Sequence, residues 1–552
     1  MKRLLALAVV FTLTGCASLP MAGPVRIGPD LVPTTDGESF YYSPSSPVEG
    51  ATQAEILNGF IAAGTGPQND YAVAREFLSE GIRASWNPNQ EVLIQRSSPK
   101  LNVTDDDTAE LVIDVSAFVD ADGKYQTTPV GTTRVLDFSF IQEDGQWRLS
   151  QAPDATVLIR PVFDVVFSGY SVFFVDRQKR YLVPELRWFP TTAATGTRLA
   201  NALLRGASSW LKPAVVSAIP SGTRLSIDAV TVENGVALVD LTARALVASR
   251  ADRSLMKAQL EATLSQLPNV SEVAISIERA RQEITDSDAD SRQIQARSLA
   301  VLSEEGLELI SSAEEPFFGS GKKFFELTQV EDFALSRQSG WGAYLSEAGV
   351  IRTRAENPGG EVEQIDSRTA IAGVAFDRQD YLWTVSRAAG AEIIATSPSL
   401  DSVVVAASWL EGQSVRGFAL SPGGSKIALL VQGSGQTRVL VSAIVRDLTG
   451  TPIELVEPIQ IANELSNPTS VSWVDQITIA IVNTEAGTAT ALLSTIGGTG
   501  RQIPALPGTR SIVAAGVNSQ LYLLTEEGEL FAFRGSTWNP LRQSIRALTL
   551  IN

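Results

Sequence analysis

The sequence predicts a multidomain protein with an α+β domain, an α/β domain and an all-β propeller of about six blades. Three observations predict this order. Residues 47–165 place two segments of helical periodicity before a run of alternating strands. Residues 166–282 alternate between strands and helices. Residues 298–552 contain short strands that recur about every 40–45 residues, a period typical of propeller blades.

Residues 1–15 resemble a bacterial lipoprotein signal peptide. Lys2 and Arg3 precede an apolar run over residues 4–13, which is too short to cross a bilayer core of ~30 Å as a helix. The segment Leu13-Thr14-Gly15-Cys16 resembles a lipobox, in which the cysteine is acylated and becomes the mature N-terminus. Cys16 is also the only cysteine of the chain. We therefore predict lipidation at Cys16 and a lipid anchor on the extracytoplasmic face of the cell membrane. The alternative is an ordinary signal peptide with an incidental cysteine.

Composition excludes several classes of function. The net charge of −17 argues against nucleic-acid binding, which needs Lys and Arg to displace counterions. The chain has no histidine, and this removes Ser-His-Asp and Cys-His catalysis as well as histidine metal sites. Catalysis by paired carboxylates or by a Ser-Lys pair remains chemically open. We expect no enzymatic activity, no cofactor and no metal.

Residues 16–46 are expected to form a lipidated N-terminus and a flexible tether, because proline recurs there among Gly, Ser and Thr. Two helices should open the α+β domain at residues 47–165, the second of them capped by Asp70. Their apolar positions are Ile56, Leu57, Phe60 and Ile61 in the first, and Val73, Phe77, Leu78 and Ile82 in the second.

Strands should follow in this domain over residues 111–115 and 135–141, with hairpin turns at Asp122-Gly123 and Asp144-Gly145. Two helices followed by such a meander resemble the NTF2-like cone fold, which often holds a pocket. The run of aspartates at 105–107 is interpreted as a solvated turn before a strand.

The α/β domain at residues 166–282 is the most informative part of the sequence. Asn234-Gly235 is its strongest hairpin signal, and Gly206 should end a helix. Strands are expected over 170–175, 181–189, 224–232, 236–241 and 270–277, and helical segments over 195–204, 213–218 and 252–267. Asp176, Glu185 and Asp240 are candidates for a hydrolytic carboxylate pair, but two of them stand at strand ends, where Asp suits turns.

Five short words in this region resemble the sporulation and germination module called GerMN. They are Phe174-Val175-Asp176, Leu182-Val183-Pro184-Glu185, Ala218-Ile219-Pro220-Ser221-Gly222-Thr223, Asn234-Gly235-Val236-Ala237 and Val239-Asp240-Leu241. With a lipobox before it and a β-rich region after it, the chain resembles the actinobacterial lipoprotein family LpqB over nearly all of its mature length. Each of these words also suits a turn, a strand end or the start of a helix, so the resemblance supports a fold more than a chemical activity.

Residues 283–297 are expected to be a linker. Residues 285–291 resemble the start of a calcium loop, but Ser291 stands where the loop needs Gly and Arg297 where it needs Glu. The glycine-rich segment 319–322 lacks the first Gly and the Ser or Thr of a phosphate loop. A solvated hinge and an ordinary loop are therefore the better interpretations.

The propeller prediction depends on strands that cluster in repeated units. Phe376 and Phe418 mark corresponding points of two units, and the glycine-rich segments 433–435 and 497–500 read as turns between strands. The alternative is an irregular pair of β-sandwiches. Tryptophans are scattered through the region, and such residues more often pack between sheets than form a binding rim: Trp341, Trp383, Trp409, Trp473 and Trp538. The same interpretation is applied to Trp188 and Trp210 in the preceding domain.

The resemblance to LpqB implies a function that composition does not show. The family is associated with the MtrA–MtrB two-component system, in which MtrB is the sensor kinase, and with cell-wall homeostasis and division. By that resemblance the partner would be the extracellular domain of an MtrB-like sensor kinase, and the membrane would be reached through lipid on Cys16. The alternative is a receptor for a cell-wall glycan or peptide that uses the NTF2-like pocket or the propeller channel. A wall hydrolase is the least favoured interpretation.

Overall fold

The computed structural model describes the chain from Pro44 to Ile551 with short gaps. The described residues are 44–105, 107–287, 297–304, 306–310, 330–336, 338–354, 362–433, 435–516 and 519–551. Residues 44–552 form one compact unit. Cys16 and the phosphate-loop-like segment 319–322 lie outside the described residues. Within the described part, no helix combines the length and the apolar character needed to cross a membrane.

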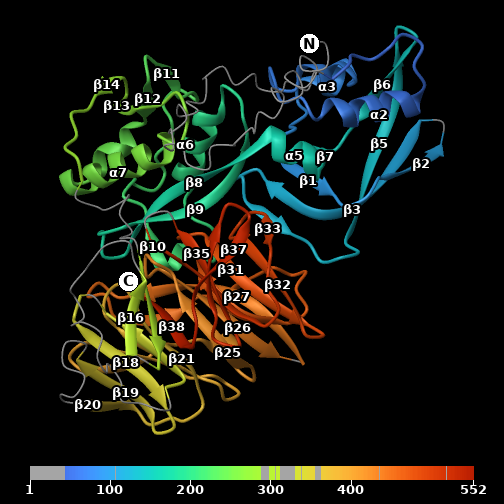
Figure 1. The fold of residues 1–552 in the computed structure, drawn as a ribbon. Coiled ribbons are helices and arrows are strands. Elements are labelled where there is room, and N and C mark those ends of the chain that lie inside the picture. The colour runs from blue at the N-terminus through green and yellow to red at the C-terminus, as the bar shows by residue number, and fades with distance from the viewer. Residues whose placement is uncertain are drawn as a thin grey trace, which may run out of the picture. The chain divides into compact units, whose positions relative to one another are not determined.

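The first domain packs helices against one curved sheet (Figure 1). The strand order is β6-β5-β3-β1-β7, with β2 and β4 also paired to the long strand β3. The core between helices and sheet is aromatic, with Phe60 against Trp86 and Phe138. The elements are α2 (Gln53–Ala63), α3 (Ala72–Glu76), α4 (Glu80–Arg83), β1 (Glu91–Gln95), β2 (Lys100–Asp105), β3 (Thr108–Asp120), β4 (Tyr125–Thr127), β5 (Thr133–Glu143), β6 (Gln146–Gln151) and β7 (Thr156–Ile159).

Helix α2 forms where the apolar spacing predicts it. Thr52 caps its N-terminus in a capping box with Glu55. The prediction of one helix from Asp70 through Ile82 is wrong. Asp70 has a left-handed backbone and caps nothing, and the chain forms two short helices with an extended segment between them. That segment exchanges backbone hydrogen bonds with Leu149 at the edge of the sheet, and a continuous helix could not supply those groups.

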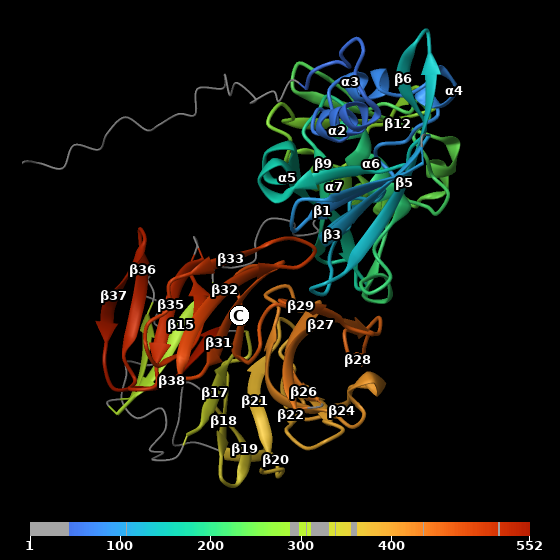
Figure 2. The same ribbon diagram turned by 90° about the vertical axis from the view of Figure 1, so that its right-hand side faces the viewer.

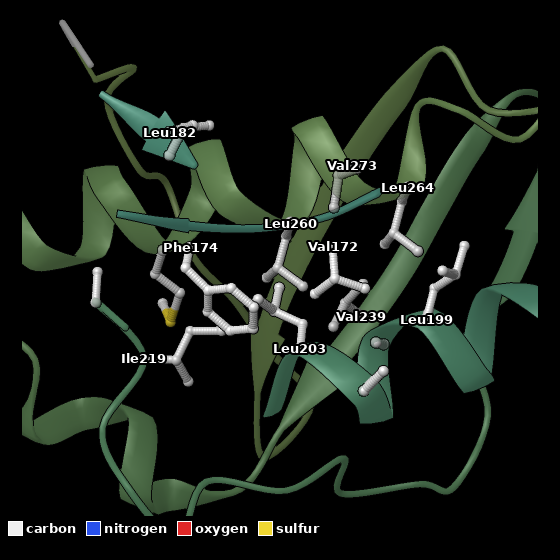
Figure 3. Close-up of a cluster of buried hydrophobic side chains, with 14 of the residues drawn as sticks. Val172, Phe174, Leu182, Leu199, Leu203, Ile219, Val239, Leu260, Leu264 and Val273 are labelled. Carbon is white, nitrogen blue, oxygen red and sulfur yellow. The ribbon is translucent and has the colours of Figure 1, made fainter. Parts of the chain in front are cut away.

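The middle domain combines two small sheets with helices α6 and α7 around one apolar core (Figure 3). Strands β12 and β13 are parallel and joined by α7, whose residues Leu260 and Leu264 face Val172 and Val239. The elements are α5 (Arg160–Val166), β8 (Phe167–Asp176), β9 (Leu182–Pro190), α6 (Thr195–Arg205), η1 (Lys212–Ala214), β10 (Val215–Val216), β11 (Thr231–Glu233), β12 (Val236–Leu241), η2 (Ala243–Val247), α7 (Arg250–Leu264), β13 (Glu272–Ile277) and β14 (Ala280–Arg281).

Two predictions for the middle domain are corrected. The segment 213–218 is not a second helix, because a single 3₁₀ turn at η1 gives way at once to β10, which pairs with β8. The segment 224–232 is not one strand. Only Thr231–Glu233 joins the sheet, and Leu225 makes an isolated bridge to Leu241.

The Asn234-Gly235 turn has the predicted geometry, since both residues have positive φ of 52° and 83°. We expect Gly235→Ala to destabilise the protein by about 1–2 kcal/mol, because a side chain there resists the left-handed backbone and its Cβ would lie 2.8 Å from the Ser271 hydroxyl. Gly222→Ala is the matched control, because Gly222 also has positive φ but open space around it. In thermal unfolding, Gly235→Ala should have a lower melting temperature than Gly222→Ala. Equal melting temperatures would argue against the contact with Ser271.

Residues 298–551 form six successive sheets in the described part of the chain. The sheets are β16-β15-β38, β17–β20, β21–β24, β25–β28 with β29, β30–β33 and β34–β37. One strand of each sheet contacts the next sheet, namely β38, β17, β21, β25, β30 and β34, and these are called the inner strands. Figure 2 shows β15 and β38 side by side, although one begins and the other ends this part of the chain.

Neighbouring strands within each of these sheets are antiparallel. They are β15 (Ser298–Ser303), β16 (Gly306–Ile310), β17 (Asp332–Leu335), β18 (Trp341–Ser346), β19 (Gly349–Arg354), β20 (Val362–Asp366), β21 (Ile371–Phe376), β22 (Leu382–Ser386), β23 (Ile393–Thr396), β24 (Ser402–Val404), β25 (Ser414–Leu420), β26 (Lys426–Gly433), β27 (Gln436–Arg446), β28 (Pro452–Leu455), β29 (Ile459–Ile461), β30 (Pro468–Trp473), β31 (Thr478–Glu485), β32 (Thr488–Thr495), β33 (Gly500–Ile503), β34 (Thr509–Ala515), β35 (Gln520–Thr525), β36 (Leu530–Arg534), β37 (Thr537–Arg542) and β38 (Ile545–Ile551).

The tryptophans of this domain pack mainly against protein. Trp383 and Trp473 are fully buried, and the Trp538 ring packs against the Phe533 ring with a centroid distance of 4.8 Å and a tilt of 54°. Phe376 and Leu420 directly precede corresponding turns, so Leu420 rather than Phe418 is the structural equivalent of Phe376. Gly497 and Gly498 lie between strands β32 and β33, as predicted, whereas Ser434 in the segment 433–435 lies outside the described residues.

Candidate functional site: the interface of the middle domain with the third domain

The three candidate carboxylates of the middle domain serve separate structural contacts. Asp176 accepts hydrogen bonds from three backbone N–H groups in its own turn at residues 178–181. Glu185 belongs to a buried ion pair with Arg187, at 2.7 Å. Asp240 accepts the backbone N–H that follows strand β13. Among the described residues, none of these contacts joins one of the three carboxylates to another, so the structure does not bring them together as a hydrolytic pair.

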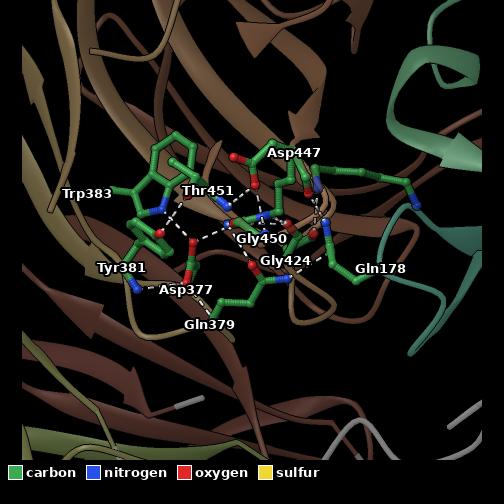
Figure 4. Close-up of polar contacts among 12 residues, drawn as sticks. Gln178, Asp377, Gln379, Tyr381, Trp383, Gly424, Asp447, Gly450 and Thr451 are labelled. Atoms are coloured by element: carbon green, nitrogen blue, oxygen red, sulfur yellow. Dashed lines mark hydrogen bonds and ion pairs between the residues drawn. The ribbon is translucent and has the colours of Figure 1, made fainter. Parts of the chain in front are cut away.

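A buried ion pair lies where the third domain faces the middle domain (Figure 4). The Asp377 carboxylate and the Arg446 guanidinium are 2.5 Å apart, with 0% and 4% of their side chains exposed. Trp383 donates its indole N–H to Asp377 at 2.7 Å, and Arg446 also donates to the Gly450 carbonyl. Burial of both charges is stable only because every charged group finds partners of this kind.

The middle domain reaches this ion pair through the turn after β8. Gln178 donates its amide N–H to the Asp447 carbonyl at 2.6 Å and accepts from Gln379 at 3.3 Å (Figure 4). The Arg378 guanidinium lies 3.9 Å from the centre of the Tyr181 ring, a cation–π contact. The turn and the ion pair therefore form one polar network across the two domains.

A second part of the same interface is built around Lys426 at the start of β26. Its ammonium is fully buried and donates to the carbonyls of Pro184 and Gln476, each at 3.0 Å. Burial lowers the pKa of Lys426 to about 8, because the charged form loses its hydration. On the middle-domain side, Trp188 donates its indole N–H to the Gly497 carbonyl at 2.8 Å. We call the contacts around Asp377 and Lys426 together the module interface.

The first domain also reaches the third. Asn463 donates to the Thr127 hydroxyl at 3.1 Å, and a cavity of about 520 Å³ opens beside this contact. Trp210, Tyr125 and Lys426 contribute to its lining, one residue from each domain. Trp210 also packs against the apolar cores on both sides of the module interface. The contacts between domains are thus apolar as well as polar.

A separate cavity of about 340 Å³ lies among the inner strands, and we call it the axial cavity. Residues from β17, β21, β25, β30, β34 and β38 all contribute to its lining. Asp332 lies at its wall, where burial raises the pKa of the carboxyl to about 6 and two backbone N–H groups hold it. The arginines Arg297, Arg416 and Arg510 line the same cavity.

The contacts described at these places are hydrogen bonds, ion pairs and apolar packing between domains. The residues that the structure describes contain no group of three or more His, Cys, Asp or Glu side chains placed to hold a metal ion. Of the calcium-loop residues, Asp286 pairs instead with Lys257 at 2.6 Å, while residues 288–296 lie outside the described part.

The principal residues of the module interface carried little signal in the sequence. Lys426 and Arg446 stand in or beside apolar strands, where a charged residue ordinarily faces water. Asp377 and Gln379 could be assigned to a turn but not to a partner. The sequence gives one indication of these residues: a charged residue stands at a strand position where the alternation of side chains predicts a buried one.

Comparison with known proteins gives matches along the whole described chain. Three family models match: "Lipoprotein LpqB, N-terminal domain" over residues 46–164, "Sporulation and spore germination" over 171–283 and "Lipoprotein LpqB beta-propeller domain" over 321–547. A protein of Cutibacterium acnes named Lipoprotein LpqB is 24% identical and covers 100% of this chain and 99% of its own length. A protein of Bifidobacterium longum with the same name is 25% identical, over 80% of this chain and 78% of its own.

Part of the chain is similar to a solved structure. The tandem GerMN domains of the sporulation protein GerM from Bacillus subtilis match with a TM-score of 0.19 and 15% identity. That match covers 28% of this chain and 64% of the solved one.

Proposed function

Because this chain belongs to the LpqB lipoprotein family, we propose that it is anchored by lipid on Cys16 at the extracytoplasmic face of the cell membrane and acts there by protein–protein contact. The partner proposed is the extracellular domain of an MtrB-like sensor kinase, within cell-wall homeostasis and division. The protein would shift the kinase between active and inactive states by binding one of them more tightly. No catalytic step is part of this proposal.

The module interface is the observation that carries the proposal. A protein that works by contact needs its surfaces held in a fixed relation, and here buried charges at Asp377, Arg446 and Lys426 join the middle and third domains. A tether on the same membrane as the kinase raises the effective concentration of both partners, so a weak contact suffices.

The finer description of the fold belongs to the same proposal. We propose that the first domain is NTF2-like, since α2 and α3 cover one face of its curved sheet. We also propose that the six sheets are six propeller blades, closed by the pairing of β38 with β15. The predicted domain and linker boundaries after residues 165, 282 and 297 remain predictions from the sequence.

The test is autophosphorylation of the full-length sensor kinase reconstituted in vesicles with the lipidated protein. We expect the lipidated chain to change the rate of autophosphorylation, and the lipid-free Cys16→Ser variant to change it far less at the same concentration. The Cys16→Ser variant should still bind the soluble extracellular domain of the kinase in surface-based titrations. An unchanged rate in the presence of the lipidated chain would contradict the proposal.

A receptor for a cell-wall fragment is the second candidate, and the axial cavity is the observation that favours it. The first domain favours it less, because aromatic side chains fill the space between its helices and sheet. Addition of purified muropeptides should raise the melting temperature if a fragment occupies the axial cavity. A kinase modulator would show no such rise with the fragment alone.

A further inference from the structure

The inner strands share a repeated irregularity at the end where each begins. Five of the six contain a β-bulge or register shift at this end, at residues 371–374, 415–417, 468–470, 509–511 and 545–547. A bulge leaves a residue unpaired and redirects its side chain. The single unpaired residues in four of them are Arg416, Thr469, Arg510 and Arg546.

Each of these four residues is exposed and directly follows a buried one, so the pattern repeats from sheet to sheet. Arg416 and Arg510 line the axial cavity, and Thr469 lies between them on β30. Glu331 precedes the remaining inner strand, β17, and together with Asp332 it adds two carboxyl groups to the lining of the cavity. Of the arginines at these bulges, Arg416 on β25 and Arg510 on β34 line the cavity, and Arg546 follows at the start of β38, next to the lining residue Ala547. We call Arg416, Thr469 and Arg510, with Arg546 beside them, the arc.

The arginines of this arc retain free charge. Arg416 donates to the side-chain oxygen of Gln432, and Arg510 donates to the Arg546 carbonyl at 2.9 Å. Neither guanidinium forms an ion pair with any residue that the structure describes. Arg546 pairs with Glu304 at 3.0 Å, but both side chains are largely exposed. Such a surface pair contributes little and can rearrange around a ligand.

The arc also lies away from the module interface. Strand β25 runs from its bulge to Leu420, and the turn that follows leads to Lys426, which contacts the middle domain. Strand β21 likewise runs from its bulge to the turn that holds Asp377. The bulges thus stand at the opposite ends of the inner strands from the interface, where a ligand would not compete with the domain contacts.

We propose that the arc of Arg416, Thr469 and Arg510 at the axial cavity, with Arg546 beside it, binds a multivalent anion through its phosphate or carboxylate groups. Guanidinium groups bind both oxyanions with paired, charge-assisted hydrogen bonds. A chain with a net charge of −17 repels anions in general, so such binding requires a local site. This inference stands beside the proposed kinase contact and does not depend on it.

The experiment is calorimetric titration of the mature Cys16→Ser chain with sodium tripolyphosphate in one arm and citrate in the other. We expect saturable binding that weakens as salt is raised. The double variant Arg416→Ala/Arg510→Ala should lose about tenfold or more in affinity, because each arginine supplies a charge-assisted hydrogen bond. The tighter of the two anions identifies the recognised group as phosphate or carboxylate.

Two further variants keep the test sharp. Arg501→Ala is the matched control, since Arg501 is an exposed arginine on β33 and has no ion pair within the described ranges. Its affinity should equal that of the parent chain. Thr469→Arg should bind more tightly, because it adds a fourth guanidinium at the equivalent bulge. Absence of saturable binding of both anions, or equal affinity in the double variant and the parent, would overturn the proposal.

Discussion

Replacing Asp377 by alanine is expected to lower the free energy of unfolding of the third domain by about 3–5 kcal/mol. The substitution leaves the Arg446 guanidinium buried without its counter-charge and removes the acceptor of the Trp383 indole N–H. A buried charge that loses its partner keeps the full cost of its lost hydration, which is why the expected effect is large. Urea unfolding followed by tryptophan fluorescence would measure the change.

The matched control is Asp164→Ala, which breaks an exposed ion pair with Arg160 whose side chains are 47% and 40% accessible. Water already screens that pair, so the expected change is about 0–1 kcal/mol. Asp377→Asn should fall between the two, because an amide oxygen can still accept from Trp383 but carries no charge. If Asp377→Ala behaved like Asp164→Ala, the ion pair would not be the stabilising centre of the module interface.

Replacing Lys426 by methionine is expected to remove a pH dependence of stability between about pH 8 and 10.5. In the folded chain burial lowers the pKa of Lys426 to about 8 from 10.5. Between these values the unfolded chain holds a proton that the folded chain has released, so the free energy of unfolding rises with pH. The free energy of unfolding decreases again when the pH is lowered to 8. Its total change between pH 8 and 10.5 is about 3 kcal/mol.

The measurement is the difference in unfolding free energy between the parent chain and Lys426→Met at several pH values. The contributions of groups that titrate in both proteins cancel in that difference. The difference should increase from pH 8 to 10.5 and stay constant below pH 7. Lys257→Met is the control, because an ion pair with Asp286 raises the pKa of Lys257 instead. Its difference should be flat through pH 8–10, and a flat difference for Lys426 as well would show that its ammonium is hydrated.

Local signals in the sequence predicted the elements that local forces determine. Helix α2 follows from apolar spacing and a capping residue, and the Asn234-Gly235 hairpin follows from the backbone freedom of two residues. The segment after Asp70 differs because the distant strand residue Leu149 competes for its backbone hydrogen bonds. Periodicity alone contains no information about such a competitor.

The candidate sites also separate into features that local sequence signals indicate and features that depend on distant contacts. No pattern paired Asp377 with Arg446 or brought Lys426 to Pro184, since these contacts join elements far apart in the chain. The arginine arc did leave a trace in Val415-Arg416-Gly417, Thr509-Arg510-Ser511 and Ile545-Arg546-Ala547. A buried β-branched residue, an arginine and a small residue recur there at the start of three inner strands, a repeat that can be read once the units are aligned.

The pairing of β38 with β15 has a consequence for the order in which the protein can mature. Synthesis proceeds from the N-terminus, so the first domain and the middle domain are complete long before the seven residues that form β38 exist. Until then the sheet of β15 has an open edge, and an open edge can pair with a neighbouring chain. The newly made protein therefore passes through a stage that is vulnerable to aggregation and proteolysis, and the final strand ends that stage.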